Sequence, residues 1–333
     1  MAKPDDYLWD GSGGDPEVAR LEGLLRPLRH DAPLDELRLR RRSKLPWIIA
    51  GIMVVAAAFV LVVVWPRSGG GGRACLGPGM VFSASGTITC NGEALAVGVL
   101  PVQGTLETGA QTAELTIADI GTAKLGANTI VRLDHTVVGK RHQLFLQQGT
   151  MHARVNAPPR IFAVATPSAD VTDLGCEYTL EIDRHGAGSI QVITGQVELE
   201  TGNGAVVLAP AGTHGRLLPG RRASLPLIDG ASPRITAAVA ELEDGKPDAI
   251  AHVLAAATKA DAITIANLAR VVSEVHKRTV LKTLATLVAA PQCTTIDEAL
   301  ADKDLWDMWF EEVYLVHIGA SDGAPSPRCT PTP

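Results

Sequence analysis

Histidines are the first side chains in this 333-residue sequence that could perform acid–base or metal chemistry, because nine are present. His135, His142 and His152 lie near one another along the chain, and a hairpin would let His142 and His152 face each other. A metal site needs further carboxylate or cysteine ligands at suitable spacing, and none stands near these residues. We interpret the three histidines as solvent-facing strand residues and expect no metal.

Four carboxylates could form the acid pair of a glycosidase: Asp170, Asp173, Glu177 and Glu181. Residues 177 and 181 would share one face of a strand, as the residues of any half-exposed polar edge do. The sequence has no Gly-x-Ser-x-Gly or His-Glu-x-x-His motif, and the glycine run at 69–72 lacks the Lys-Ser/Thr of a phosphate loop. We therefore assign no catalytic residue and no cofactor, and we expect a protein without enzymatic activity.

Five cysteines could form disulfides, but none belongs to a Cys-x-x-Cys or Cys/His metal pattern. Cys75 and Cys90 are close in sequence and flank the start of the first predicted domain, so we favour them as a disulfide pair. Cys176 lies in an apolar strand pattern and is expected to be a buried thiol.

Aromatic residues concentrate in one predicted helix near the C-terminus. Trp309 lies on the apolar stripe of this helix, whereas Trp306 and Phe310 lean off it. Core packing is one explanation for these rings. The other is an exposed aromatic strip, which makes Trp306 and Phe310 candidate contacts for a partner.

A long apolar stretch, Leu45–Trp65, must position everything else in the chain. From Ile48 to Val64 it has no charged or polar side chain. At about 1.5 Å per residue, roughly 20 apolar residues cross a bilayer core of about 30 Å. Trp47 and Trp65 stand at its two ends, where indoles favour the headgroup layer. The sequence thus predicts a single transmembrane helix over residues 46–66.

Charge sets the expected orientation of this span. Five positive residues lie between Arg38 and Lys44, whereas Arg67 and Arg73 alone follow the span closely. The positive-inside rule then places the N-terminus in the cytoplasm and the larger part on the opposite side of the membrane. The net charge of −6 argues against nucleic acid as a partner.

The expected cytoplasmic segment, residues 1–45, contains one short helical pattern. Asp15 can cap it with Pro16 at the first helical position, and Leu21 and Leu25 belong to its apolar stripe. Such a helix cannot bury a core alone. Leu21 and Leu25 are therefore candidate contacts for a cytoplasmic partner; a helix lying on the membrane and a passive tail are the alternatives.

Beyond the span, four parts follow: a Gly-rich linker (67–80), a strand-rich region (81–228), a helical region (229–318) and a tail (319–333) expected to be disordered. Short β-branched or alternating runs recur roughly every eight to ten residues in the second part, which predicts an all-β sandwich, barrel or solenoid. The third part has a helical period and predicts a small bundle.

Cap residues mark where helices of this bundle should begin. Asp261 can cap one helix, Thr295 with Glu298 fits a capping box, and Asp304 can cap the last helix.

Several stretches of the strand-rich region carry a family pattern. Its most specific parts are Thr166-Pro167, Leu174-Gly175-Cys176-Glu177-Tyr178 and Gly195-Gln196-Val197, within Phe162–Ile182 and Val192–Glu200. Cys176 stands where the pattern has threonine, and Tyr178 where it has phenylalanine. With these residues, the region from about Ala96 to Gly215 resembles the FecR domain family.

The resemblance implies a compact β-solenoid-like or sandwich-like domain in the periplasm, here followed by a small α-helical bundle. It also implies signalling from an envelope partner, through one span, to a cytoplasmic sigma factor or other regulator. The cytoplasmic segment is shorter than the usual anti-sigma domain, and a bundle replaces the usual β-rich C-terminal module. The alternative is an envelope scaffold or ligand-binding module for which the span is only an anchor.

Overall fold

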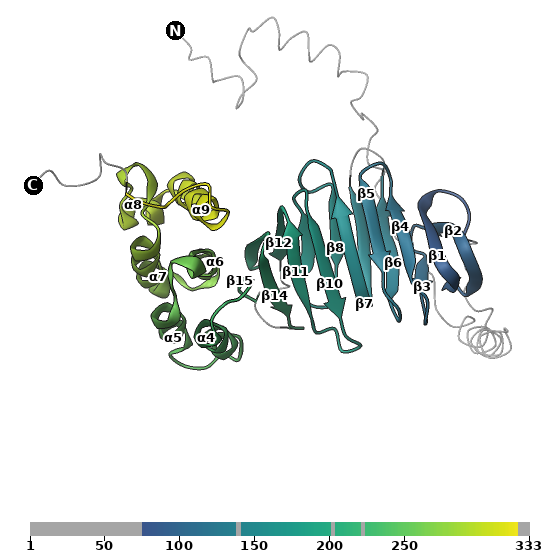
Figure 1. Ribbon diagram of the computed structural model, residues 1–333, viewed down its shortest axis with the longest axis horizontal. Coiled ribbons are helices and arrows are strands. Elements are labelled where there is room, and N and C mark those ends of the chain that lie inside the picture. The colour runs from purple at the N-terminus through teal and green to yellow at the C-terminus, as the bar shows by residue number, and fades with distance from the viewer. Residues whose placement is uncertain (1–74, 138–140, 201–203, 221–223, 326–333) are drawn as a thin grey trace, which may run out of the picture. The chain divides into compact units, whose positions relative to one another are not determined.

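The computed structural model of the chain describes residues 75–137, 141–200, 204–220 and 224–325 (Figure 1). They belong to one compact unit, Gly69–Pro333. Within these ranges no helix is long and apolar enough to cross a membrane. The predicted cytoplasmic segment with Leu21 and Leu25, and the predicted span at 46–66, lie outside the described residues and stay predictions.

The described chain is β-rich with a C-terminal helical region, as the sequence predicts. All of its strands join one hydrogen-bonded sheet system, in which they succeed one another approximately in chain order (Figure 1). The strands are β1 (Gly79–Cys90), β2 (Glu93–Pro101), β3 (Thr105–Glu107), β4 (Ala113–Ile117), β5 (Gly121–Leu125), β6 (Ile130–Thr136), β7 (His142–Val155), β8 (Phe162–Ala165), β9 (Asp170–Asp173), β10 (Glu177–Ile182), β11 (Gly188–Thr194), β12 (Gln196–Glu200), β13 (Val206–Pro210), β14 (Thr213–Leu217) and β15 (Leu227–Ile228).

Strand β7 changes its neighbours halfway along its length. Its first half pairs with β6 and, in parallel, with β8, whereas its second half pairs with β5 and β10. The change falls at Gly149, whose φ is +101°. A Cβ on Gly149 would lie 2.4 Å from the Cα of Thr129, so only glycine fits here.

The hydroxyl of Thr129 completes this crossing. It accepts a hydrogen bond from the Thr150 N–H at 3.0 Å and donates one to the Thr150 carbonyl at 3.2 Å. Thr129 is fully buried, so its side chain replaces water for backbone groups that ordinary strand pairing would leave open. One strand can thus serve two sets of neighbours.

The continuity of β7 corrects one expectation about the histidines. His142 and His152 lie in the two halves of the same strand and do not face each other across a hairpin. Gly149 lies inside β7, at the crossing point, and does not end the strand in a turn.

Side chains from alternate strand positions fill the β core. Leu, Val, Ile and Ala predominate, and Phe82, Phe162 and Tyr178 are the largest rings buried there. Burial on one face of each strand with partial exposure on the other gives the alternating pattern from which the strands were predicted.

The helices form a second hydrophobic core. They are α4 (Pro233–Glu243), α5 (Ala249–Ala256), α6 (Ala262–Val271), α7 (Glu274–Leu287), α8 (Ile296–Ala301) and α9 (Lys303–His317). Thr295 and Glu298 form the predicted capping box of α8. The cap of α9 is Asp302, which accepts from the Asp304 N–H, so the expectation that Asp304 is the cap was wrong by two residues.

The folded region extends further at its C-terminal side than expected. The Ala289 N–H donates to the Gly323 carbonyl at 3.1 Å, and the Ser321 hydroxyl donates to Glu312. Residues 319–325 therefore pack on the helices and are not part of a disordered tail. Residues 326–333 lie outside the described ranges.

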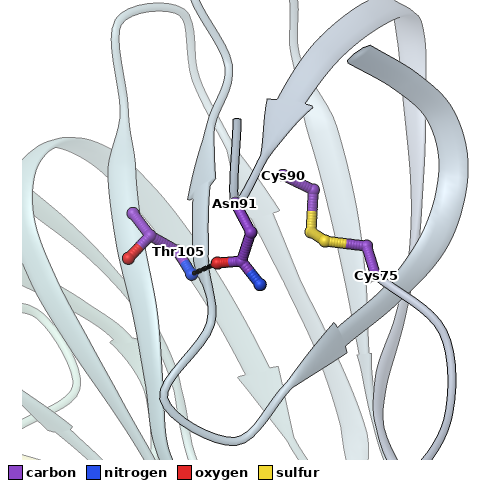
Figure 2. Close-up of a disulfide and its surroundings, with 4 residues drawn as sticks. All are labelled: Cys75, Cys90, Asn91 and Thr105. Atoms are coloured by element: carbon purple, nitrogen blue, oxygen red, sulfur yellow. Dashed lines mark hydrogen bonds between the residues drawn. A yellow bond between two sulfur atoms is a disulfide. The ribbon is translucent and has the colours of Figure 1, made fainter. Parts of the chain in front are cut away.

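At the N-terminal side, Cys75 and Cys90 form a disulfide, the pair favoured from the sequence (Figure 2). Cys75 is fully buried, and its carbonyl accepts a hydrogen bond from the Val99 N–H at 3.0 Å. The folded region therefore includes Cys75 and begins before the expected boundary at residue 81. Beside the disulfide, Asn91 Oδ1 accepts from the Thr105 N–H at 2.8 Å, which fastens the β1–β2 turn to β3 (Figure 2).

Replacing Cys75 and Cys90 together by alanine should lower the free energy of unfolding by about 3 kcal/mol, because the bond closes a loop of 15 residues. Urea unfolding of the purified chain measures this. Val97→Ala, at a side chain 65% exposed on β2, is the matched control and should leave the midpoint unchanged. Equal midpoints for the double variant and the control would contradict a stabilising role of the disulfide.

Candidate functional site

The family-patterned turn between β9 and β10 is built around a buried carboxylate. Asp173 Oδ1 accepts from the Gly175 N–H at 2.6 Å, and Oδ2 accepts from the Cys176 thiol at 2.7 Å. Gly175 has a φ of +90°, which suits glycine. The Cys176 thiol thus donates a hydrogen bond to the Asp173 carboxylate, as a hydroxyl group at this position would.

Burial sets the chemistry of this turn. It raises the pKa of the Asp173 carboxyl, although the hydrogen bonds from Cys176 and Gly175 oppose the shift. Burial and the nearby Asp173 also raise the pKa of the Cys176 thiol, which keeps it protonated and unreactive. Asp173 and Cys176 therefore have a structural role in the turn and do not form a pair of catalytic base and nucleophile.

Tyr178 follows the turn and is fully buried. Its hydroxyl has no hydrogen-bond partner among the described residues, and burial raises its pKa well above the usual value. A phenylalanine would fill the same space without an unpartnered hydroxyl, which fits the residue type of the family pattern.

The carboxylates and histidines considered for chemistry do not converge on one point. His152 contacts Thr179 Oγ1 and Glu177 Oε1, both at 3.0 Å, while Glu181 is exposed. His142 is buried against Thr136, and burial lowers its pKa. Across the described ranges, no group of three or more His, Cys, Asp or Glu side chains could hold a metal ion.

Polar side chains of the helices hydrogen-bond to the backbone of the β region at the junction between the sheet and the helices. Edge strand β13 pairs with β12 on one side, and α6 meets its other side. Asn267 of α6 accepts from the Leu208 N–H at 2.7 Å and donates to the Leu208 carbonyl at 2.8 Å. This fully buried amide takes the place of a neighbouring strand.

Two further bonds fasten the helices at the same junction. The Thr264 hydroxyl of α6 donates to the Pro226 carbonyl at 2.7 Å. Nε2 of His317, at the end of α9, donates to the Ala211 carbonyl at 2.8 Å. The helical region is therefore tied to the β region by side chains from both α6 and α9.

A groove of about 580 Å³ opens along this junction. Its lining residues come from the loop before β8, from β12 and β13, and from α6, α7 and α9. They are Arg160, Glu198, Gly204, Ala205, Val206, Leu208, Arg270, Lys277, Lys303, Trp306, Asp307, Phe310 and Glu311. We name it the junction groove.

Trp306 and Phe310 do not form the exposed aromatic strip that one reading of the sequence suggested. They are only 8% and 6% exposed and pack in the helical core, where the Trp306 ring centroid lies 6.2 Å from that of Trp309 and 6.1 Å from that of Phe310. Helix α6 covers the side of α9 that seemed free, because Arg270 places its guanidinium 4.2 Å from the Phe310 ring centroid. Both rings line the groove although each is almost fully buried.

Sequence reasoning missed Asn267 and Arg270. A signal was present, since Asn267 interrupts an otherwise apolar face of the helix that Asp261 was expected to cap. A buried amide needs partners, but the sequence does not show that they lie 59 residues earlier, on an edge strand.

The described residues form a β-rich region joined to a helical region. Residues 104–198, within the β-rich region, match the family model described as FecR protein. No curated protein sequence matches the chain.

Two crystal structures are similar to part of the chain. Both are of a protein from Parabacteroides distasonis that is provisionally described as an anti-sigma factor, at 1.65 and 2.50 Å resolution. Each is 17% identical, has a TM-score of 0.33, and matches over 41% of this chain and 64% of that chain. The match thus spans less than two thirds of those chains.

Asn267→Ala should lower the free energy of unfolding by about 2–4 kcal/mol, because it removes two hydrogen bonds and leaves the Leu208 N–H and carbonyl buried without partners. Urea unfolding measures the loss. Val275→Ala, at a side chain 84% exposed on α7, is the control. If both variants unfold at the same urea concentration, the amide does not hold the edge strand.

Asp173 should make the protein less stable as the pH rises. Its folded-state pKa is raised, while its unfolded-state pKa is about 3.9, so between these values the folded state binds more protons than the unfolded state. The free energy of unfolding of the native chain, relative to Asp173→Asn, should therefore fall from about pH 4 towards about pH 7. Urea unfolding across this range tests the sign, and a relative stability that rises with pH would contradict it.

Proposed function

We propose that the chain is a membrane-anchored regulatory protein of the FecR type, without enzymatic activity. In this proposal, Leu45–Trp65 spans the inner membrane with the N-terminus in the cytoplasm, and the β and helical regions lie in the periplasm. The match of residues 104–198 to the FecR family model is the observation that carries the proposal.

Two further features support this arrangement. The apolar stretch and the positive charges before it are typical of a single span with a cytoplasmic N-terminus. The disulfide between Cys75 and Cys90 suits a domain exported to an oxidising compartment, because disulfides are rare in the cytosol.

The signalling step would pass from the periplasmic domains to residues 1–45. A protein partner in the envelope would bind the periplasmic part, and the stripe that contains Leu21 and Leu25 would contact a cytoplasmic sigma factor or another transcriptional regulator. Residues 1–45 lie on the cytoplasmic side of the proposed topology, so they are available for this readout.

Deleting residues 1–30 should change transcription of the genes that the partner controls, while the rest of the chain remains in the membrane. RNA sequencing of the deletion strain against the strain with the intact chain measures this. Capture with residues 1–45 as bait should recover a sigma factor or regulator, and Leu21→Asp with Leu25→Asp should abolish the recovery.

Arg20→Asp is the matched control for this capture, since it changes charge in the same segment without altering the apolar stripe. An unchanged transcriptional profile after the deletion would contradict the proposed signalling role. It would instead favour an envelope scaffold whose span serves as an anchor.

A further inference from the structure

Arg270 lines the junction groove and forms no ion pair within the described part of the chain. Its guanidinium carbon lies 4.2 Å from the centroid of the Phe310 ring, a cation–π contact. Its Nε is enclosed and has no hydrogen-bond partner. Burial lowers the pKa of this guanidinium, with Asp307 and Glu198 opposing the shift.

The other charged residues of the groove are largely engaged. Arg160 forms a two-point pair with Glu198, with its Nε 3.1 Å from Oε2. Lys303 pairs with Asp307. Lys277 lies 3.4 Å from Glu274, which does not line the groove.

Stacking leaves the in-plane donors of a guanidinium free to bind. The ring of Phe310 occupies one face of Arg270, while the two Nη groups lie in the guanidinium plane and bond to nothing within the described part of the chain. A planar two-oxygen acceptor matches this fork. The neighbouring rings of Trp306 and Phe310 offer apolar surface to the rest of such a ligand.

A carboxylate and a phosphate can each offer two oxygens to a guanidinium, and the charge of the groove selects between them. Asp307, Glu198 and Glu311 are carboxylates in the lining, and they would repel a phosphate dianion more strongly than a monoanion. The lining holds four cationic side chains (Arg160, Arg270, Lys277 and Lys303) and these three carboxylates, so its net charge of +1 balances one negative charge. A carboxylate fits this balance and a phosphate does not.

The geometry points to the junction groove as a binding site for a carboxylate that carries an apolar group, held by the Nη donors of Arg270 beside Trp306 and Phe310. The carboxylate could belong to a small molecule or to an acidic side chain of a polypeptide. The site is independent of the proposed signalling role, because its residues all lie in the β and helical regions and none lies in residues 1–45.

Fluorine NMR of the full-length chain with 4-fluorobenzoate tests this inference. Saturable binding is expected, with a dissociation constant on the order of 1 mM for so small a ligand. Neutral 4-fluorobenzamide and inorganic phosphate should not compete. An end-blocked peptide with one glutamate beside a phenylalanine is the second arm: tighter competition by the peptide than by benzoate assigns a polypeptide ligand, and the reverse assigns a small molecule.

Arg270→Lys should weaken 4-fluorobenzoate binding about tenfold, because an ammonium group lacks the two-point fork. Arg234→Lys, at an exposed arginine of α4, is the matched control and should change nothing. Glu311→Gln should tighten binding, since it removes an exposed negative charge from the lining.

The Glu311 variant keeps the test sound even if Arg270→Lys disturbs the packing of α6 on α9. Absence of saturable binding by both the benzoate and the peptide would overturn the inference. Binding that Arg270→Lys and Glu311→Gln leave unchanged would overturn it as well, because the ligand would then lie elsewhere.

Discussion

The close approach of Gly149 to Thr129 is the constraint on which the β region depends. A strand normally has two neighbours, but β7 has four: its pairing with β8 and β6 ends at Phe145 and Gln148, and its pairing with β10 and β5 begins at Gly149 and Met151. Glycine permits the backbone angle, and the Thr129 hydroxyl accepts from the Thr150 N–H and joins the Gly126 N–H in donating to the Thr150 carbonyl. Because β5, β6, β8 and β10 all register against β7, their positions follow from this crossing.

A second constraint lies where the sheet ends and the helices begin. An edge strand with free N–H and carbonyl groups invites pairing with other chains. Here Asn267 satisfies both groups of Leu208, and α6 lies where another strand would otherwise add. The amide does more than protect the edge: it fixes α6, and α6 in turn sets Arg270 over Phe310 and forms one wall of the junction groove.

The sequence allowed the strand-rich region, the helical region and several helix starts to be predicted, because these depend on periodicity and on local caps. Thr295 with Glu298 is such a case, since the bonds join residues three apart. The course of β7 was not predicted, because a glycine after two glutamines is equally typical of a turn. The surroundings of Trp306 and Phe310 were missed for a different reason: a helical pattern shows which face of a helix is apolar, but not that an arginine from another helix will cover the rest.

The disulfide at the start of the fold has a mechanical consequence. Cys75 is bonded to the last residue of β1, so a pull on the chain at Cys75 reaches β1 at Cys90 and not at Gly79. Cys90 lies between Glu93 of β2 and Leu106 of β3, and tension there loads the hydrogen bonds of both neighbours together. The hydrogen bonds of β1 therefore cannot break one after another from its first residue. A force applied at Cys75 must instead break those at the end of β1 together.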